Sequence, residues 1–138
     1  MRILLVEDDE NTAVAFSKLL EMKRHEVIVC GSLQQTKDVL GRDQAFDLML
    51  CDIGLPDGDG WKLGPLAQSL HIPALATSAY VMPQDHEQST SAGFLEHIDK
   101  PFSAEMIDRI IIRYDPSAGI TRRSFSVADA PSPRRALA

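Results

Sequence analysis

Cysteine is scarce in this sequence, which has only two cysteines, Cys30 and Cys51, among 138 residues. Each ends an apolar run typical of a buried β-strand, and free cysteine is among the residue types most often buried. In the strand order predicted below, one strand separates theirs, which places the two residues about 9–10 Å apart. A disulfide cannot span that distance without backbone movement, so we expect two reduced, buried thiols.

Long hydrophobic runs are also absent. The first apolar stretch, residues 3–6, stops at Glu7 after four residues, far short of the apolar region of a signal peptide. No later run approaches the ~20 residues that a transmembrane helix needs. We therefore expect a cytoplasmic chain that does not associate with membranes. With 138 residues, 44% of them hydrophobic, it can bury one core.

Basic residues are also few relative to acidic ones, and the formal net charge is −6. Residues 115–138 carry an excess of two positive charges, which leaves −8 on residues 1–114. Such an acidic body argues against direct binding to nucleic acid through counterion release. The final segment is rich in proline and serine and poor in bulky apolar residues, so we expect a disordered tail or linker at 115–138 after one domain at 1–114.

Strand and helix patterns alternate through the domain. Apolar runs predict strands over residues 2–6, 27–30, 46–51, 73–77 and 94–98. Helical patterns lie between and after them, over residues 10–23, 32–40, from about 61, 84–92 and after 103. Cap residues support three of these helices: Asp9 or Asn11, then Ser32 with Gln35 and a closing Gly41, then Ser103.

This alternation predicts an α/β fold. The expected architecture is a doubly wound, flavodoxin-like sheet of five parallel strands in the order 2-1-3-4-5, with helices on both faces. Residues 53–60 are saturated with turn formers and are expected to form a loop at the carboxyl edge of the sheet.

Polar side chains follow four of the five strands. They are Glu7 and Asp8 after the first, Asp52 after the third, Ser78 after the fourth and Lys100 after the fifth. Because the carboxyl ends of parallel strands share one edge, these side chains should converge on a single crevice.

A cation is needed in such a crevice. Two carboxylates about 4 Å apart repel by roughly 4 kcal/mol at an effective dielectric near 20. An all-oxygen set of Glu7, Asp8 and Asp52 is what Mg²⁺ selects. Magnesium beside a lysine and a hydroxyl typically positions a phosphoryl group, and a carboxylate can itself be the nucleophile that accepts it.

With these residues in view, the sequence resembles the receiver domains of two-component response regulators over residues 2 to about 113. The matching features occur in order: an acidic pair after the first strand, Asp52-x-x-x-Pro56-x-x-Asp59-Gly60, Ser78-Ala79, and Lys100-Pro101. The amino-acid sequence of the loop that begins at Asp52, together with residues 92–97, is most similar to receivers attached to hybrid sensor kinases.

The resemblance implies roles for the crevice residues. Asp52 would accept a phosphoryl group from a phosphohistidine on a histidine kinase or phosphotransfer protein. Mg²⁺ would be bound by Asp8, Asp52 and the carbonyl of Gly54, with Glu7 acting through water. Ser78 and Lys100 would each contact a phosphoryl oxygen. In the family the bond before Pro101 is commonly cis.

Such a domain is a phosphoacceptor that assists its own phosphorylation and dephosphorylation rather than an enzyme. It would switch a protein-interaction face made by the fourth helix, the fifth strand and the fifth helix, for a downstream protein target. Monomer and phosphorylation-dependent dimer both remain open.

Two positions depart from the common pattern. On the fifth strand, the family usually has an aromatic switch residue, and His97 occupies that position here. An aromatic residue, Tyr80, instead lies two residues after Ser78. We hypothesise that the Ser78 hydroxyl still moves toward the phosphoryl group while His97 reorients as a smaller switch residue.

The remaining acidic, aromatic, histidine and arginine residues are interpreted as structural, without a role in chemistry. Asp57 and Asp59 are interpreted as turn and cap residues, because the spacing after them does not fit a calcium loop. Trp61 is expected to pack beside the loop. The four histidines are too scattered for a metal site, and the four tail arginines suit a solvated linker.

Two rival functions stay open. One is an interaction module that keeps the fold but is not phosphorylated. The other is a phosphotransfer sink in a relay, with rapid self-dephosphorylation because the small Gly54 and Ala79 would leave the phosphoryl group open to water.

Overall fold

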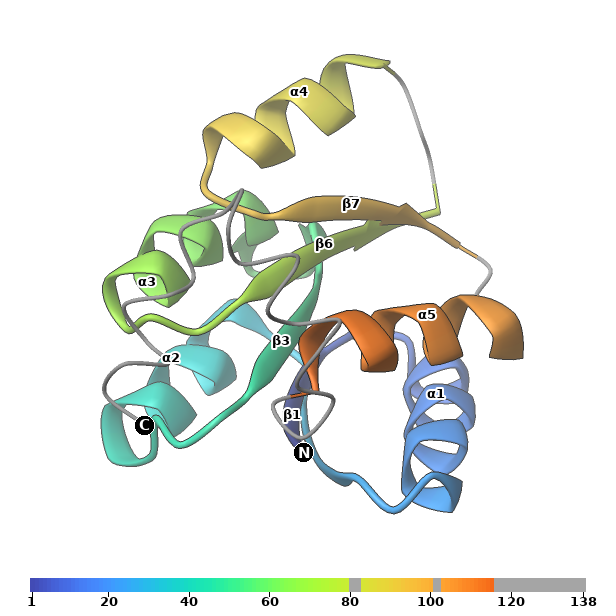
Figure 1. Cartoon of the computed structure of the whole chain (residues 1–138). Helices are drawn as coiled ribbons and strands as arrows, with labels where there is room; N and C mark the ends of the chain where they lie inside the picture. The colour runs from blue at the N-terminus through green and yellow to red at the C-terminus, as the bar shows by residue number, and fades with distance from the viewer. Residues whose placement is uncertain (80–82, 101–102, 116–138) are drawn as a thin grey trace.

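The computed structural model describes residues 1–79, 83–100 and 103–115, and its centre is a parallel sheet (Figure 1). The strands of this sheet are β1 (Arg2–Val6), β2 (Glu26–Cys30), β3 (Leu48–Asp52), β6 (Ala74–Ser78) and β7 (Glu96–Asp99). Their spatial order is β2-β1-β3-β6-β7. Counted along the chain, this is the predicted order 2-1-3-4-5, which is confirmed. Residues 116–138, Tyr80 and Pro101 lie outside the described residues.

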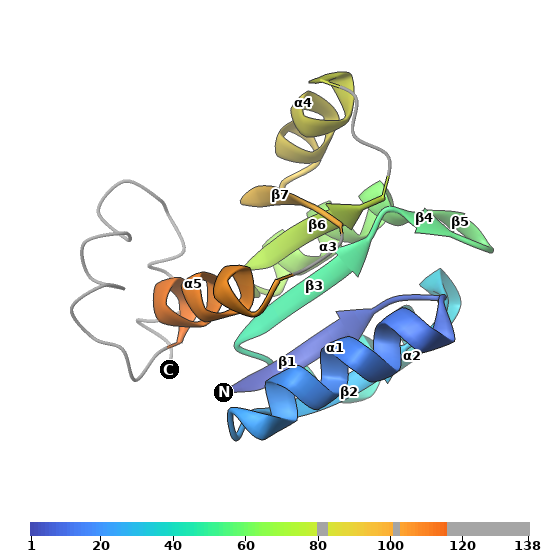
Figure 2. The ribbon, with the colours of Figure 1, turned by 90° about the vertical axis from the view of Figure 1, so that its right-hand side faces the viewer.

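Helices cover both faces of the sheet. They are α1 (Glu10–Met22), α2 (Leu33–Arg42), α3 (Leu63–Ser69), α4 (Pro83–Ser91) and α5 (Ala104–Tyr114), with a short 3₁₀ helix η1 (Gly60–Lys62) before α3. The views in Figures 1 and 2 show α1 and α5 together on one face and α2 and α3 on the other, with α4 beside the edge strand β7. The predicted doubly wound architecture is therefore confirmed.

Local chemistry explains where these helices begin. A side-chain oxygen accepts a backbone N–H of the first turn at the start of α1, α2 and α5, from Asp9, Ser32 and Ser103 respectively. Asn11, the alternative cap considered for α1, lies inside that helix instead.

Two local predictions are wrong. Gly41 does not close α2, which continues to Arg42; the side chain of Gln44 donates to the Leu40 carbonyl at 3.1 Å, so the last turn is satisfied without a glycine cap. Residues 53–60 are not irregular throughout, since β4 (Gly54–Leu55) and β5 (Gly58–Asp59) pair as a short antiparallel hairpin. Figure 2 shows this hairpin extending from the end of β3.

The core has two apolar clusters, one on each face of the sheet. The first joins alternate strand residues to α2 and α3, through Leu33, Leu40, Leu63 and Ala67. The second joins the other strand residues to α1 and α5, through Phe16, Leu20, Ile107 and Ile110. Cys30 and Cys51 are free and buried, as expected, and both neighbour Val6 in the parallel register.

The amino end of the sheet is fastened by Arg2. Its guanidinium is 2.9 Å from Glu26 and 2.6 Å from Asp43, and it lies 4.6 Å above the centre of the Phe46 ring. These contacts join β1 and β2 to the chain that leads into β3. Within the described residues, no helix has the length and hydrophobicity needed to cross a membrane.

Candidate functional site

The end of β1 positions the first acidic side chains. The ladder continues one residue past the strand, because the Glu7 N–H donates to the Cys30 carbonyl at 2.9 Å. Glu7 is thereby held at the sheet edge with only 3% of its surface exposed, and its Oε2 accepts the Asp9 N–H at 3.1 Å. Asp8, the next residue, is exposed.

The end of β3 positions Asp52, which is 8% exposed. The Gly54 N–H donates to its Oδ1 at 2.9 Å, which fixes the orientation of the carboxylate. The loop after β3 comes back to the end of this strand at Gly60, whose N–H donates to the Ile53 carbonyl at 3.0 Å. A Cβ on Gly60 would lie 2.4 Å from the Asp52 carbonyl oxygen, so only glycine fits this close approach.

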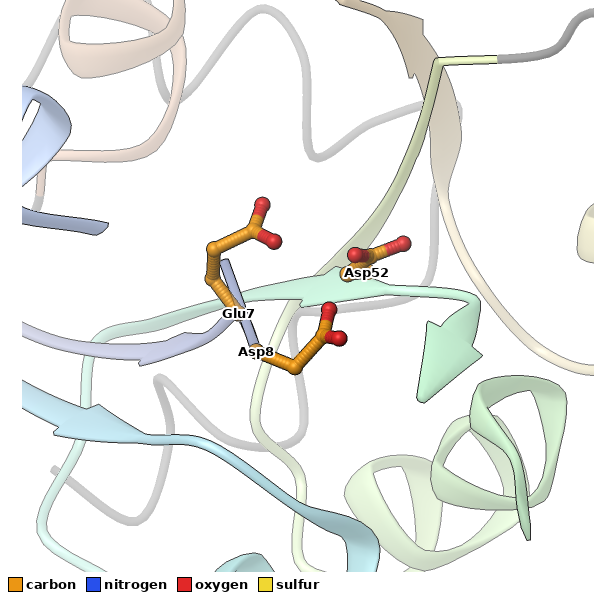
Figure 3. A group of neighbouring side chains, drawn as sticks. All are labelled: Glu7, Asp8 and Asp52. Carbon is orange, nitrogen blue, oxygen red and sulfur yellow. The ribbon is translucent and has the colours of Figure 1, made fainter. Parts of the chain in front are cut away.

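Carboxylates from these two strand ends form one cluster. Glu7, Asp8 and Asp52 each offer an oxygen, and these oxygens lie within 4.8 Å of one another. Figure 3 shows the three side chains directed into the same space. The grouping predicted from the sequence is thus present, and its mutual repulsion requires a positive charge nearby.

Lys100 supplies one such charge from the end of β7. Its Nζ donates to Glu7 Oε1 and lies 3.3 Å from Asp52 Oδ2. The Lys100 N–H also donates to the Ser78 carbonyl at 2.8 Å, so the lysine backbone is tied to the end of β6.

Burial and pairing act in opposite directions at this ion pair. Burial raises the pKa of Glu7 and outweighs the lowering by the Lys100 hydrogen bond. At Lys100, burial disfavours the charged form, but the hydrogen bond to Glu7 and the negative charge of Asp52 prevail, so the pKa of the ammonium is raised. We conclude that Lys100 stays protonated among the acidic groups.

Ser78 is the last residue of β6 and is buried, with 7% exposed. It pairs in register with Asp99, while Ala79 after it is exposed. Ser78 therefore lies at the same edge of the sheet as Asp52 and Lys100, as the sequence predicted.

The donor atoms of the cluster indicate which kind of metal ion it could hold. Among the described residues, the cluster able to hold an ion offers carboxylate oxygens only, with neither imidazole nor thiolate. Hard divalent cations such as Mg²⁺ prefer these ligands over softer ones. Glu7, Asp8 and Asp52 thus fit the group that the sequence predicted there.

His97 belongs to a hydrogen-bonded chain that sequence reasoning missed. Its Nδ1 is 2.8 Å from Ser89 Oγ in α4, and the same oxygen accepts the Trp61 indole N–H at 2.9 Å. Trp61 packs against the core as expected, but Ser89 carried no signal in the sequence because it lies in a wholly polar helix.

Asp57 and Asp59 are turn and cap residues, as interpreted from the sequence. Asp59 accepts the Trp61 N–H at the start of η1. Asp57 reaches further and accepts the backbone N–H groups of Leu33 and Gln34, at 2.8 and 2.9 Å, at the start of α2. The loop after Asp52 is therefore linked to a second helix.

Comparison with known proteins agrees with this geometry. The sequence model of the response regulator receiver domain matches residues 3–112. The chain is 30% identical over 127 residues to the signal transduction histidine-protein kinase BarA of Escherichia coli K12, covering 89% of this chain and 14% of BarA. The likeness to receivers attached to sensor kinases is therefore confirmed, and the chain spans only a small part of that relative.

Shorter relatives match over nearly their whole length. The polar-differentiation response regulator DivK of Brucella ovis is 31% identical over 116 residues, covering 81% of this chain and 94% of DivK. The crystal structure of a CheY-like receiver domain protein from Methanospirillum hungatei JF-1 superposes with a TM-score of 0.76 at 26% identity, covering 83% of this chain and 93% of that one. The chain belongs to the response regulator receiver domain family.

Proposed function

We propose that this receiver domain accepts a phosphoryl group on Asp52, with the help of Mg²⁺, and thereby switches a protein-interaction face. The observation that carries the proposal is the meeting of Glu7, Asp8 and Asp52 with the ammonium of Lys100 at one edge of the sheet. Carboxylates, a divalent cation and a lysine are the groups that position and neutralise a phosphoryl group.

Asp52 is the nucleophile in this proposal. Its Oδ1 is held by the Gly54 N–H, and its Oδ2 faces Lys100. A carboxylate oxygen of Asp52 forms a bond to phosphorus while the bond from phosphorus to the donor's imidazole nitrogen breaks. The cation, held by Glu7, Asp8, Asp52 and the Gly54 carbonyl, would supply charge neutralisation for the phosphoryl oxygens.

Ser78 and Lys100 respond to the product. Phosphorylation adds negative charge and three acceptor oxygens at Asp52, and both side chains can donate to them. Moving a two-state equilibrium from 1:99 to 99:1 takes about 5.5 kcal/mol, which a few charge-assisted hydrogen bonds of about 1.5–3 kcal/mol each can supply. The proposed readout is the face of α4, β7 and α5, with His97 as the switch residue; Tyr80 lies outside the described residues.

The partner in transfer is proposed to be a histidine kinase or a phosphotransfer protein, because BarA carries the name of a histidine-protein kinase. A hollow of about 650 Å³ lies beside Lys100, between α1 and Ala79, and includes Phe16 and Leu19 in its lining. It offers an apolar surface where such a partner could present its phosphohistidine. We place this exchange in the cytoplasm.

A relay sink with a short-lived phosphorylated form is the second candidate. It is favoured by the exposure of Gly54, whose N–H donates to Asp52, and of Ala79, which follows Ser78, because water could then reach the proposed acyl phosphate. A phosphorylated half-life of many hours would contradict it. An unphosphorylated interaction module is less favoured, since the buried acidic residues would then have no use.

The first prediction is that Asp52 is the single acceptor. Incubation with Mg²⁺ and a small phosphodonor should add one phosphoryl group to the native chain and none to Asp52→Asn, as measured by intact mass. Asp47→Asn is the matched control, since Asp47 lies at the opposite end of the sheet. Equal gains in native chain and Asp52→Asn, or no gain in the native chain, would refute the assignment.

A further inference from the structure

The sequence of helix α4 is unusual because it offers no large aliphatic side chain. Its residues 83–91 include no leucine, isoleucine, valine, methionine or phenylalanine. Among its described side chains, those of residues 87–91, only Ser89 is buried, with 1% exposed. Helices are usually held on a sheet by an apolar stripe. The buried side chain among those described in α4 carries a hydroxyl group instead.

That hydroxyl is shared by two partners from different elements. Ser89 Oγ accepts the indole N–H of Trp61 at 2.9 Å and lies 2.8 Å from Nδ1 of His97. A hydroxyl has two lone pairs and one proton, so it can accept from Trp61 and donate to His97 at the same time. Loss of the hydroxyl itself would therefore break both contacts at once.

Both partners lead directly to the candidate phosphorylation site. Trp61 follows Gly60. The backbone of Gly60 packs against the Asp52 carbonyl, and its N–H donates a hydrogen bond to the Ile53 carbonyl. His97 lies in β7 opposite Ala76, two residues before Ser78 on the neighbouring strand. Ser89 therefore contacts both the loop that follows Asp52 and the strand beside Ser78.

We propose that Ser89 is a positioning residue that couples α4 to the state of Asp52, through Trp61 on one side and His97 on the other. This rests on the proposed function. In the unphosphorylated chain, the bond to His97 holds α4 on β7 and the bond to Trp61 holds it on the loop that follows Asp52. When Ser78 turns toward a phosphoryl group, His97 changes its packing, its bond to Ser89 is lost, and α4 is released.

The second prediction tests the anchor itself, without phosphorylation. Ser89→Ala removes the hydroxyl from a helix that tolerates alanine well, and Ser91→Ala is the matched control on an exposed position of the same helix. Amide hydrogen exchange of α4, measured by mass spectrometry, should become about tenfold faster in Ser89→Ala and stay unchanged in Ser91→Ala. Equal exchange in the two variants would overturn the proposal.

Trp61 gives an independent readout because it is the one tryptophan of the chain. Its emission should shift in Ser89→Ala, since the indole N–H loses its partner, and not in Ser91→Ala. Trp61→Phe should speed α4 exchange, and the double variant should exchange like Ser89→Ala alone, because both changes break the same bond. Additive effects would overturn the Trp61 half of the coupling.

Addition of Mg²⁺ and beryllofluoride, a phosphoryl analogue, tests the coupling to Asp52. In the native chain α4 exchange should rise toward that of Ser89→Ala, while Ser89→Ala itself should change little further. A rise of equal size in both proteins would overturn the coupling alone. If a phosphodonor adds no phosphoryl group to Asp52 by intact mass, the proposed function fails and the coupling falls with it.

Discussion

Lys100 reaches two of the three clustered carboxylates and leaves the third to solvent. Its ammonium contacts Glu7 and Asp52, whereas Asp8 is exposed. One positive charge among three negative ones leaves an excess of negative charge at the edge of the sheet. A second cation at Asp8 would balance that excess, so the lysine and a divalent ion have complementary places.

Gly60 is the residue whose size matters most for the loop after Asp52. In Gly60→Ala the new Cβ would lie 2.4 Å from the Asp52 carbonyl oxygen and 2.6 Å from Ile53 Cα, so backbone must move. As the third prediction, we expect the free energy of unfolding to fall by about 1–3 kcal/mol. Phosphoryl gain should also fall under conditions where the variant is fully folded. Urea unfolding and intact mass measure the two effects.

Gly41→Ala is the matched control for that substitution. Gly41 lies inside α2 and an added Cβ would meet nothing within 4 Å. Alanine should therefore raise the free energy of unfolding by about 0.5–1 kcal/mol and leave phosphoryl gain unchanged. Equal losses in the two variants would show that space near Asp52 is not the cause.

The sequence predicted the residues of the acidic cluster because parallel strand ends must share an edge, whichever side chains they carry. Ser89 could not be predicted in this way. Its hydroxyl lies in a polar helix without hydrophobic periodicity, and its partners Trp61 and His97 are 28 and 8 residues away. Only the packed structure brings those three side chains together.

At the scale of elements, the hairpin of β4 and β5 connects the Asp52 loop to α2. Asp57, between the two short strands, accepts two N–H groups from the first turn of α2, and Ser32 accepts a third. The hydrogen bonds from Gln34 and Leu33 lower the pKa of Asp57. The negative charge is also favourable at a helix amino end.

The fourth prediction is a pH-dependent stabilisation by Asp57. A carboxyl whose pKa is lower in the folded chain stabilises it above the ordinary value of about 3.9, and that stabilisation is lost as the pH falls through the folded pKa. Asp57→Ala should therefore lower the urea midpoint at pH 7, and the difference from the native chain should shrink toward pH 3. Glu21→Ala is the matched control for the loss of an exposed carboxyl, on α1.

Element boundaries were less predictable than element order. The five strands and the caps of three helices followed from apolar runs and cap residues, which are local signals. The hairpin at 54–59 was missed because its turn-forming residues hide two very short strands. The end of α2 was missed because Gln44, beyond the helix, satisfies the carbonyl that a glycine cap would otherwise serve.

At the scale of the whole molecule, metal binding should add to stability. A ligand that binds only the folded state adds about 2.7 kcal/mol when its concentration is 100 times its Kd. As the fifth prediction, saturating Mg²⁺ should raise the urea midpoint of the native chain. In Asp8→Asn most of that increase should be lost, while stability without Mg²⁺ should rise because carboxylate repulsion is relieved.

Glu10→Gln is the control for that experiment, because it removes one exposed acidic group close to Asp8 but outside the cluster. It should keep the full effect of Mg²⁺. An increase of equal size in Asp8→Asn and the native chain would mean that the ion binds elsewhere.

Topology was predictable because short connections and right-handed crossovers leave few ways to wind alternating strands and helices into one sheet. The position of α4 was not, since its sequence lacks the apolar stripe that fixes the rotation of the other helices. Among its described side chains, the buried one is Ser89, which contacts Trp61 and His97.

The Arg2 contacts place a stabilising clasp at the amino end of the sheet, across the molecule from the acidic cluster. The Arg2 contacts and the acidic cluster thus lie at opposite ends of the strands of one sheet. A reporter fused or a surface attached at the Arg2 end would lie far from the acidic cluster, and it should leave the contacts of Arg2 with Glu26, Asp43 and Phe46 in place.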